Sequence, residues 1–144
     1  MCLFATTTCI DKKAEGYGWK AYEFNSVGNL RTPYCRIPAR RGAWKSSRAI
    51  GPYRAGARYP LGHHIFDRAW AAKTSAYWED EIALPVRWRH RLATGSFAGD
   101  PCTVARHIYV PTDEELTQEP WATMMKELEN AKYDVQKRDK AQAV

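Results

Sequence analysis

Hydrophobic and polar residues alternate strictly along the segment 86–92, which reads Val-Arg-Trp-Arg-His-Arg-Leu. A period of two is typical of a strand that buries one face and exposes the other. We therefore expect the apolar residues and His90 to face the core and the three arginines to face outward. Segment 82–92 is predicted to be a strand, the Gly-containing segment 93–101 a loop, and segment 102–110 the antiparallel partner strand.

Two further strands are predicted near the start of the chain. Segment 2–10 is rich in Thr and alternates loosely, and segment 17–24 alternates better. Segment 30–37 forms at most a short edge strand, because Pro33 and Pro38 cannot donate hydrogen bonds to a sheet. Segment 38–60 contains repeated Gly, Pro, Ser and Arg residues without a sustained period, so we expect a long loop there.

Helical periodicity appears twice. Asp67 is a favourable N-cap for a helix that runs to Trp78, with an apolar face that includes Trp70 and Tyr77. In the last part of the chain, Thr112-x-x-Glu115 has the form of a capping box. Pro120 stands in the first turn of a second helix. The apolar stripe of that helix comprises Trp121, Met124, Met125, Leu128, Ala131 and Val135.

This order of elements predicts a single α+β domain with a mostly antiparallel sheet, one packed helix, a long basic loop and a C-terminal helix. Residues 1–110 are expected to form its basic body, and residues 111–144 an acidic helical extension of the same domain. Of the 144 residues, 44% are hydrophobic and 12% aromatic, which is enough apolar surface to fold without disulfides.

Charge is distributed unevenly along the chain. The net charge is +6, although residues 111–144 hold eight acids and five bases. Residues 24–66 contain eight Arg or Lys residues and no Asp or Glu, with six aromatic residues between them. A basic surface of this kind attracts nucleic acid, anionic nucleotides or acidic protein surfaces.

The candidate phosphate-binding residues come from two places. Successive outward arginines on a strand lie about 7 Å apart, close to the phosphate spacing of an extended single strand. The basic loop supplies further cations. Alternatively, the arginines form only the solvated face of a half-buried sheet. The set comprises Arg40, Arg41, Lys45, Arg48, Arg54, Arg58, Arg87, Arg89 and Arg91.

The aromatic residues of the loop and the two histidines that follow it have two interpretations each. Trp44, Tyr53 and Tyr59 are candidates for stacking on bases, or they hold the long loop against the body. His63 and His64 are possible ligand contacts near a phosphate, or imidazoles bonded to the backbone.

The sequence gives no sign of a metal site, a cofactor or a membrane segment. No His-x-His, His-x-Glu or Cys-x-x-Cys pair is present, and no apolar run approaches the length of a membrane span. No apolar leader precedes the four cysteines, so we expect reduced thiols and a cytoplasmic location.

Three segments carry a resemblance to a known group of proteins. They are Lys20-x-Tyr22-x-Phe24, the segment Gly62-His63-His64-Ile65-Phe66-Asp67 before an Ala/Trp-rich helix, and Val104-Ala105-Arg106-x-Ile108-x-Val110. Over residues 17–110 this pattern resembles small phage and prophage domains of unknown function, which implies a viral origin and, for a phage protein, the host cytoplasm. The order of elements also resembles that of minimal ADP-ribosyltransferases.

We therefore expect a non-enzymatic phage-type protein that binds nucleic acid, or a host nucleoprotein or defence complex, through a basic aromatic surface, as an inhibitor. The alternatives are a nucleotide-binding protein or ADP-ribosyltransferase-like enzyme, and a virion or assembly component. A homodimer through the C-terminal helix is a further possibility.

Overall fold

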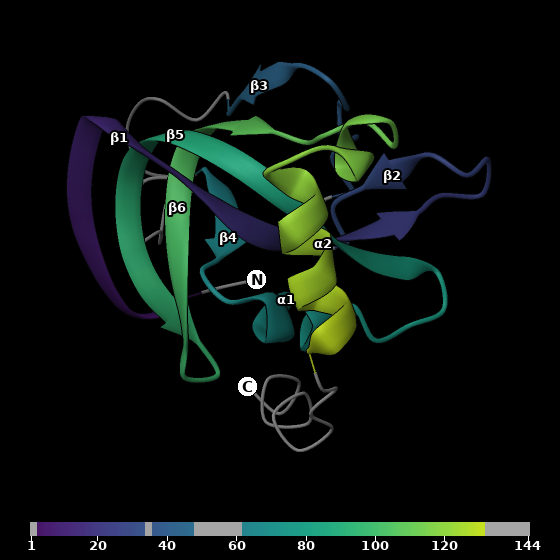
Figure 1. The fold of residues 1–144 in the computed structure, drawn as a ribbon. Helices are drawn as coiled ribbons and strands as arrows, with labels where there is room; N and C mark the ends of the chain where they lie inside the picture. The colour runs from purple at the N-terminus through teal and green to yellow at the C-terminus, as the bar shows by residue number, and fades with distance from the viewer. Residues whose placement is uncertain (1–2, 34–35, 48–61, 132–144) are drawn as a thin grey trace.

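The computed structural model describes residues 3–33, 36–47 and 62–131. The described part of the chain has a mostly antiparallel sheet with helices packed beside it (Figure 1), which confirms the predicted α+β class. Within it, no helix has the length and apolar character needed to cross a lipid bilayer. The elements in chain order are β1 (Phe4–Phe24), β2 (Leu30–Arg31), β3 (Trp44–Ser46), β4 (His63–Phe66), α1 (Ala69–Ser75), β5 (Glu81–Phe97), β6 (Asp100–Tyr109), the 3₁₀ helix η1 (Glu115–Thr117) and α2 (Trp121–Asn130).

Strand β5 pairs with β1 along one edge and with β6 along the other. The second edge of β6 is shared between β4 and β3, and β4 meets β1 at the pair Trp19 and Phe66. Strands β1, β5, β6 and β4 thus form a closed circuit of antiparallel pairs, and the first three are strongly curved in Figure 1. Closure of this kind protects strand edges that would otherwise be exposed.

Irregularities in the pairing allow this curvature. Three register shifts interrupt the β1–β5 ladder, one of them between Asp11 and Glu15, and one interrupts the β5–β6 ladder between Arg91 and Ala93. Such bulges bend a strand and increase its twist. The prediction of separate strands at 2–10 and 17–24 was wrong, because β1 continues through the polar segment between them.

The hairpin of β5 and β6 was predicted correctly, but its loop is much shorter than 93–101. Strand β5 continues to Phe97, which pairs with Asp100. Ala98 and Gly99 have φ angles of 51° and 83°, so the two-residue turn has positive φ at both positions, as type I′ hairpin turns do.

In the segment between β1 and β4 the strands lie at other positions than the sequence indicated. Residues 38–60 were predicted to be a loop, yet β3 lies within them and pairs with β6 at Trp44 and Tyr109. Among the described residues of the edge strand predicted at 30–37, only Leu30 and Arg31 pair with β1.

Helix α1 is shorter than predicted. Its N-cap is Arg68 and not Asp67, and it ends at Ser75. The Asp67 carboxylate instead accepts a hydrogen bond of 2.9 Å from the Thr103 hydroxyl of β6. Asp67 therefore bonds to β6 and does not cap the helix, although local capping rules predicted that it would.

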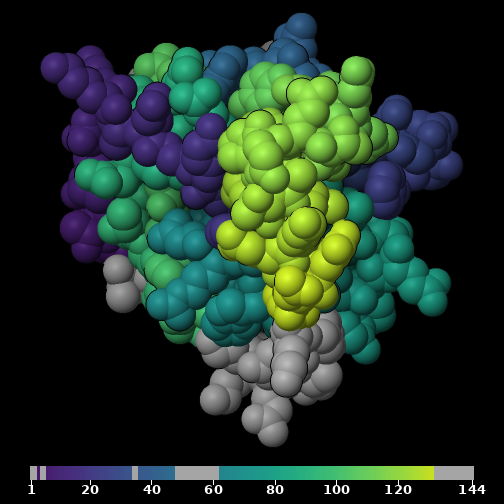
Figure 2. Space-filling view, in the orientation of Figure 1, coloured from purple at the N-terminus to yellow at the C-terminus, as the bar shows by residue number. Residues whose placement is uncertain are grey.

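The C-terminal elements follow the prediction up to Asn130, where α2 ends, although Pro120 is the N-cap of α2 and Val135 lies outside the described residues. The Glu115 amide donates to the Thr112 hydroxyl and the Thr112 amide to the Glu115 carboxylate, each at 3.2 Å, which is a capping box. Helix α2 buries Trp121, Met124 and Leu128 within the chain. Figure 2 shows α2 lying against β1 and α1 on the side in view.

Two apolar clusters form the core. In one, the helices pack on the sheet through residues such as Trp19, Phe66 and Trp121. The other lies among the strands and includes Ile65 and Trp88. Burial at Val86, Trp88, His90 and Leu92, with Arg87, Arg89 and Arg91 more exposed, confirms the alternation predicted for 86–92.

Candidate nucleic-acid interface

One row of side chains runs across four strands. Tyr17 of β1 pairs with Arg87 of β5, Arg87 with Tyr109 of β6, and Tyr109 with Trp44 of β3. Directly paired residues in antiparallel strands point to the same face of the sheet. The sheet thus places three aromatic rings and one guanidinium group side by side.

Arg87 of this row and the neighbouring Arg89 make cation–π contacts with the rings. The Arg87 guanidinium carbon lies 5.6 Å from the Tyr17 ring centre and 5.9 Å from that of Trp44. The Arg89 guanidinium carbon is closer, at 4.4 Å from the Trp44 ring centre. Such cation–π contacts hold an arginine in place and leave its N–H groups able to donate to an anion.

Helix α2 contacts two rings of the row. The Trp121 ring of α2 lies 5.5 Å from the Tyr17 ring, edge to face, and 6.2 Å from the Tyr109 ring in a stacked arrangement. Trp44 and Tyr109 are themselves 5.6 Å apart. These aromatic contacts fix the orientation of the row without any ligand.

The arginines of β5 are partly paired with carboxylates of β1. Glu15 lies 3.5 Å from Arg87 and 3.4 Å from Arg89, and Asp11 lies 3.9 Å from Arg91. These distances exceed the 2.7–2.9 Å typical of strong charge-assisted hydrogen bonds. Three guanidinium groups thus share two carboxylates at these long distances. The face therefore keeps a net positive charge, although a smaller one than the sequence suggested. We call these side chains the arginine–aromatic face: Tyr17, Trp44, Arg87, Arg89, Arg91 and Tyr109.

The loop cations predicted with these arginines differ in their surroundings. Arg40 is exposed. Arg41 forms a 2.8 Å ion pair with Asp113 and donates to the Pro111 carbonyl at 2.9 Å, so it ties the loop to the segment after β6. Lys45 donates to the Pro38 carbonyl. Arg48, Arg54, Arg58, Tyr53 and Tyr59 lie outside the described residues.

His63 and His64 are half-buried on β4. Burial, reinforced by the positive charge of Lys20, lowers the pKa of His63 to about 4 and the pKa of His64 to about 3. Both imidazoles are therefore uncharged at neutral pH, which makes them weaker partners for a phosphate than the arginines are. Among the described residues, no group of three or more His, Cys, Asp or Glu side chains is placed to hold a metal ion.

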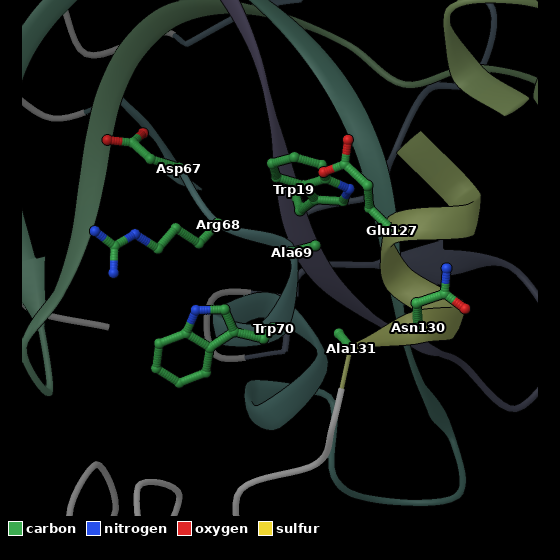
Figure 3. Close-up of a pocket in the computed structure, with 8 residues that line it drawn as sticks. All are labelled: Trp19, Asp67, Arg68, Ala69, Trp70, Glu127, Asn130 and Ala131. Atoms are coloured by element: carbon green, nitrogen blue, oxygen red, sulfur yellow. The ribbon is translucent and has the colours of Figure 1, made fainter. Parts of the chain in front are cut away.

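Two hollows lie away from the arginine–aromatic face. One of about 610 Å³ lies beside the start of α1 and the end of α2, with Trp19 and Trp70 in its wall and Asp67, Arg68 and Glu127 at its edge (Figure 3). Burial raises the pKa of Asp67.

A second hollow, of about 880 Å³, is lined by Tyr77, Trp78 and four acids. The acids that line both hollows make them poor sites for a phosphate.

Sequence reasoning missed Tyr17, Tyr109 and the carboxylates of Glu15 and Asp11. No sequence signal pointed to them, because their place beside the arginines depends on the pairing of β5 with β1 and β6, and the register with β1 is set by bulges. Comparisons with protein-family models, with curated proteins and with solved structures found no match to this chain.

Proposed function

We propose that this protein binds single-stranded nucleic acid, alone or as part of a host nucleoprotein complex, through the arginine–aromatic face. The observation that carries the proposal is the four-strand row Tyr17–Arg87–Tyr109–Trp44, with Arg89 stacked on Trp44. It combines two features that single-strand binders use, which are cations for the phosphates and aromatic rings for the bases.

The spacing of these groups supports a single strand. Arg87, Arg89 and Arg91 alternate along β5 and are therefore about 7 Å apart. The Tyr17 side of the row is open to solvent, since Tyr17 is 45% exposed. A base stacked on an exposed ring of this kind contributes about 1–3 kcal/mol. Together with the resemblance to small phage domains, this favours a role in blocking a host nucleic-acid machine.

The test is binding of fluorescent single-stranded RNA and DNA oligonucleotides to the variant Arg87→Ala/Arg89→Ala/Arg91→Ala. A matched control, Arg36→Ala/Arg68→Ala/Lys126→Ala, removes the same charge at exposed positions elsewhere. We expect the first variant to bind at least 100-fold more weakly and to lower the log–log salt slope by about 2, since each phosphate contact on a single strand contributes about 0.7.

The control variant should bind nearly as tightly as the wild type. Equal losses in the two variants would mean that net charge, and not this face, drives binding. No binding of either oligonucleotide by the wild type at low salt would refute the proposal.

A further inference from the structure

The segment between α1 and β5 exposes two aromatic rings. Helix α1 ends at Ser75, so Tyr77 does not belong to the helical apolar face that the sequence predicted. Tyr77 is 43% exposed and Trp78 is 58% exposed. Their ring centres are 5.1 Å apart, with the ring planes at 76° to each other. Large aromatic side chains exposed side by side are more typical of an interaction site than of ordinary protein surface.

Backbone hydrogen bonds hold this segment in place. The Trp78 amide donates to the Glu81 carboxylate, and the Glu81 amide donates to the Trp78 carbonyl, each at 2.9 Å. The Phe24 amide at the end of β1 donates to the Asp80 carbonyl at 2.7 Å, which attaches the segment to the β1–β2 hairpin at the right of Figure 1. The backbone that carries the two rings is therefore ordered without a partner, which lowers the entropy cost of binding one.

The surroundings of the rings are acidic. Both rings line the hollow of about 880 Å³, and four acids line it with them. Arg31 neutralises one of these acids, Glu23, through an ion pair of 2.7 Å. The other three give the hollow a negative charge, on a chain whose net charge is +6. We call this site the acidic aromatic hollow: Glu23, Pro33, Tyr77, Trp78, Glu79, Asp80 and Glu81.

Charge and ring chemistry together select the ligand. A cation over the face of a Trp or Tyr ring is attracted by the electrons of that ring. A guanidinium group can stack flat on a ring and also donate paired hydrogen bonds to a carboxylate, whereas the ammonium group of lysine acts only as a point charge. The hollow offers a guanidinium both kinds of contact, and its volume is large enough for more than one side chain.

We infer that the acidic aromatic hollow binds an arginine-rich segment of a partner protein. One arginine of that segment stacks on Trp78 and donates to Glu79 or Asp80. This binding does not depend on the nucleic-acid binding proposed for the other face and goes beyond it.

The two sites are far enough apart to be occupied together. Tyr17 of the arginine–aromatic face and Glu23 of the hollow are six residues apart on β1, which corresponds to about 20 Å along a strand. One molecule can therefore contact a nucleic acid and a basic protein at the same time. These are the two components of a nucleoprotein complex.

The experiment measures binding of an arginine-rich peptide with Gly and Ser spacers by isothermal titration calorimetry at low salt. The same peptide with Lys, or with Gln, at every arginine position is measured beside it. We expect the arginine peptide to bind more tightly than the lysine peptide, and the glutamine peptide to show no binding. Because the protein as a whole is positively charged and repels a basic peptide, binding of the arginine peptide reports a local site.

Two variants test the rings and the acids separately. Trp78→Ala should weaken binding of the arginine peptide about 10-fold, because it removes the ring on which the guanidinium stacks. Glu79→Gln/Asp80→Asn should weaken it by a similar factor and also reduce its dependence on salt. The matched control Glu114→Gln/Glu129→Gln removes two exposed carboxylates elsewhere and should keep the wild-type affinity. All three variants should keep the wild-type melting temperature, since the changed side chains are exposed.

Absence of arginine-peptide binding by the wild type, or equal binding of the glutamine peptide, would overturn the inference. Wild-type affinity in both Trp78→Ala and Glu79→Gln/Asp80→Asn would also overturn it, as would an equal loss in the control. Analytical ultracentrifugation tests a different occupant of the hollow. Self-association of the wild type that Trp78→Ala abolishes would assign the hollow to a second copy of this chain and overturn the proposed partner.

Discussion

Lowering the pH from 7 to 5 should destabilise this protein through the two histidines of β4. His63 and His64 are half-buried, and their pKa values are lowered to about 4 and about 3, mainly by burial and then by Lys20. The unfolded chain titrates near the ordinary value of 6.5. The native state therefore binds fewer protons than the unfolded state between pH 6.5 and about 4.

The size of the effect follows from proton linkage. Stability from each histidine is fully present above pH 6.5 and falls by up to about 1.4 kcal/mol for each pH unit below it. At pH 5 each ring would have lost about 2 kcal/mol, or roughly 4 kcal/mol for the pair. Because the rings are half-buried and partly screened by solvent, we expect a loss of about 2–4 kcal/mol.

The assay is urea unfolding followed by tryptophan fluorescence at pH 7 and pH 5. The wild type should show the loss of unfolding free energy calculated above. His64→Gln removes one titrating ring, so the difference between the two pH values should shrink by about 1–2 kcal/mol. Glu129→Gln, an exposed change on α2, is the control and should keep the wild-type difference. Equal pH dependence in wild type and His64→Gln would refute the reasoning.

Two further changes test the close packing of β1 and the charge of its exposed face. Gly18→Ala should lower the unfolding free energy by about 1–3 kcal/mol in urea denaturation, because the added Cβ would lie 2.5 Å from Ile65 Cγ2 and 2.7 Å from the Phe66 carbonyl oxygen. Wild-type stability in this variant would contradict that packing. Glu15→Gln should tighten binding of single-stranded RNA several-fold at low salt, because it removes a carboxylate that competes for two arginines. In the same mobility-shift assay, Glu129→Gln should have a smaller effect, and weaker binding by Glu15→Gln would show instead that Glu15 is needed to order the arginines.

The sequence predicted the fold best where one periodicity extends over a whole element. Segment 86–92 alternates without exception, and its burial follows that alternation in the structure. The capping box at Thr112 and Glu115 was also predicted correctly, because all of its hydrogen bonds are local. Both signals depend on neighbours in the sequence and not on distant pairing.

The sequence was misleading where distant strands decide the local structure. Residues 11–16 are polar and include Gly16, which is typical of a break between strands. In the structure they continue β1, because Asp11 and Glu15 face arginines of β5. Strand β3 has only three residues, and its pairing with β6 defines it. The pairing register across a bulge could not be inferred from the sequence of either strand alone. The arginines of β5 were therefore predicted without the carboxylates of β1 that lie beside them.

The arginine–aromatic face and the helix packing are parts of one structure. Trp121 of α2 is buried in the core and also contacts Tyr17 and Tyr109 of the face. The rings and the arginines stacked on them are consequently ordered before any ligand arrives. Binding to such a surface costs less side-chain entropy than binding to mobile side chains does. The packing of α2 therefore stabilises both the fold and the geometry that we propose for nucleic-acid binding.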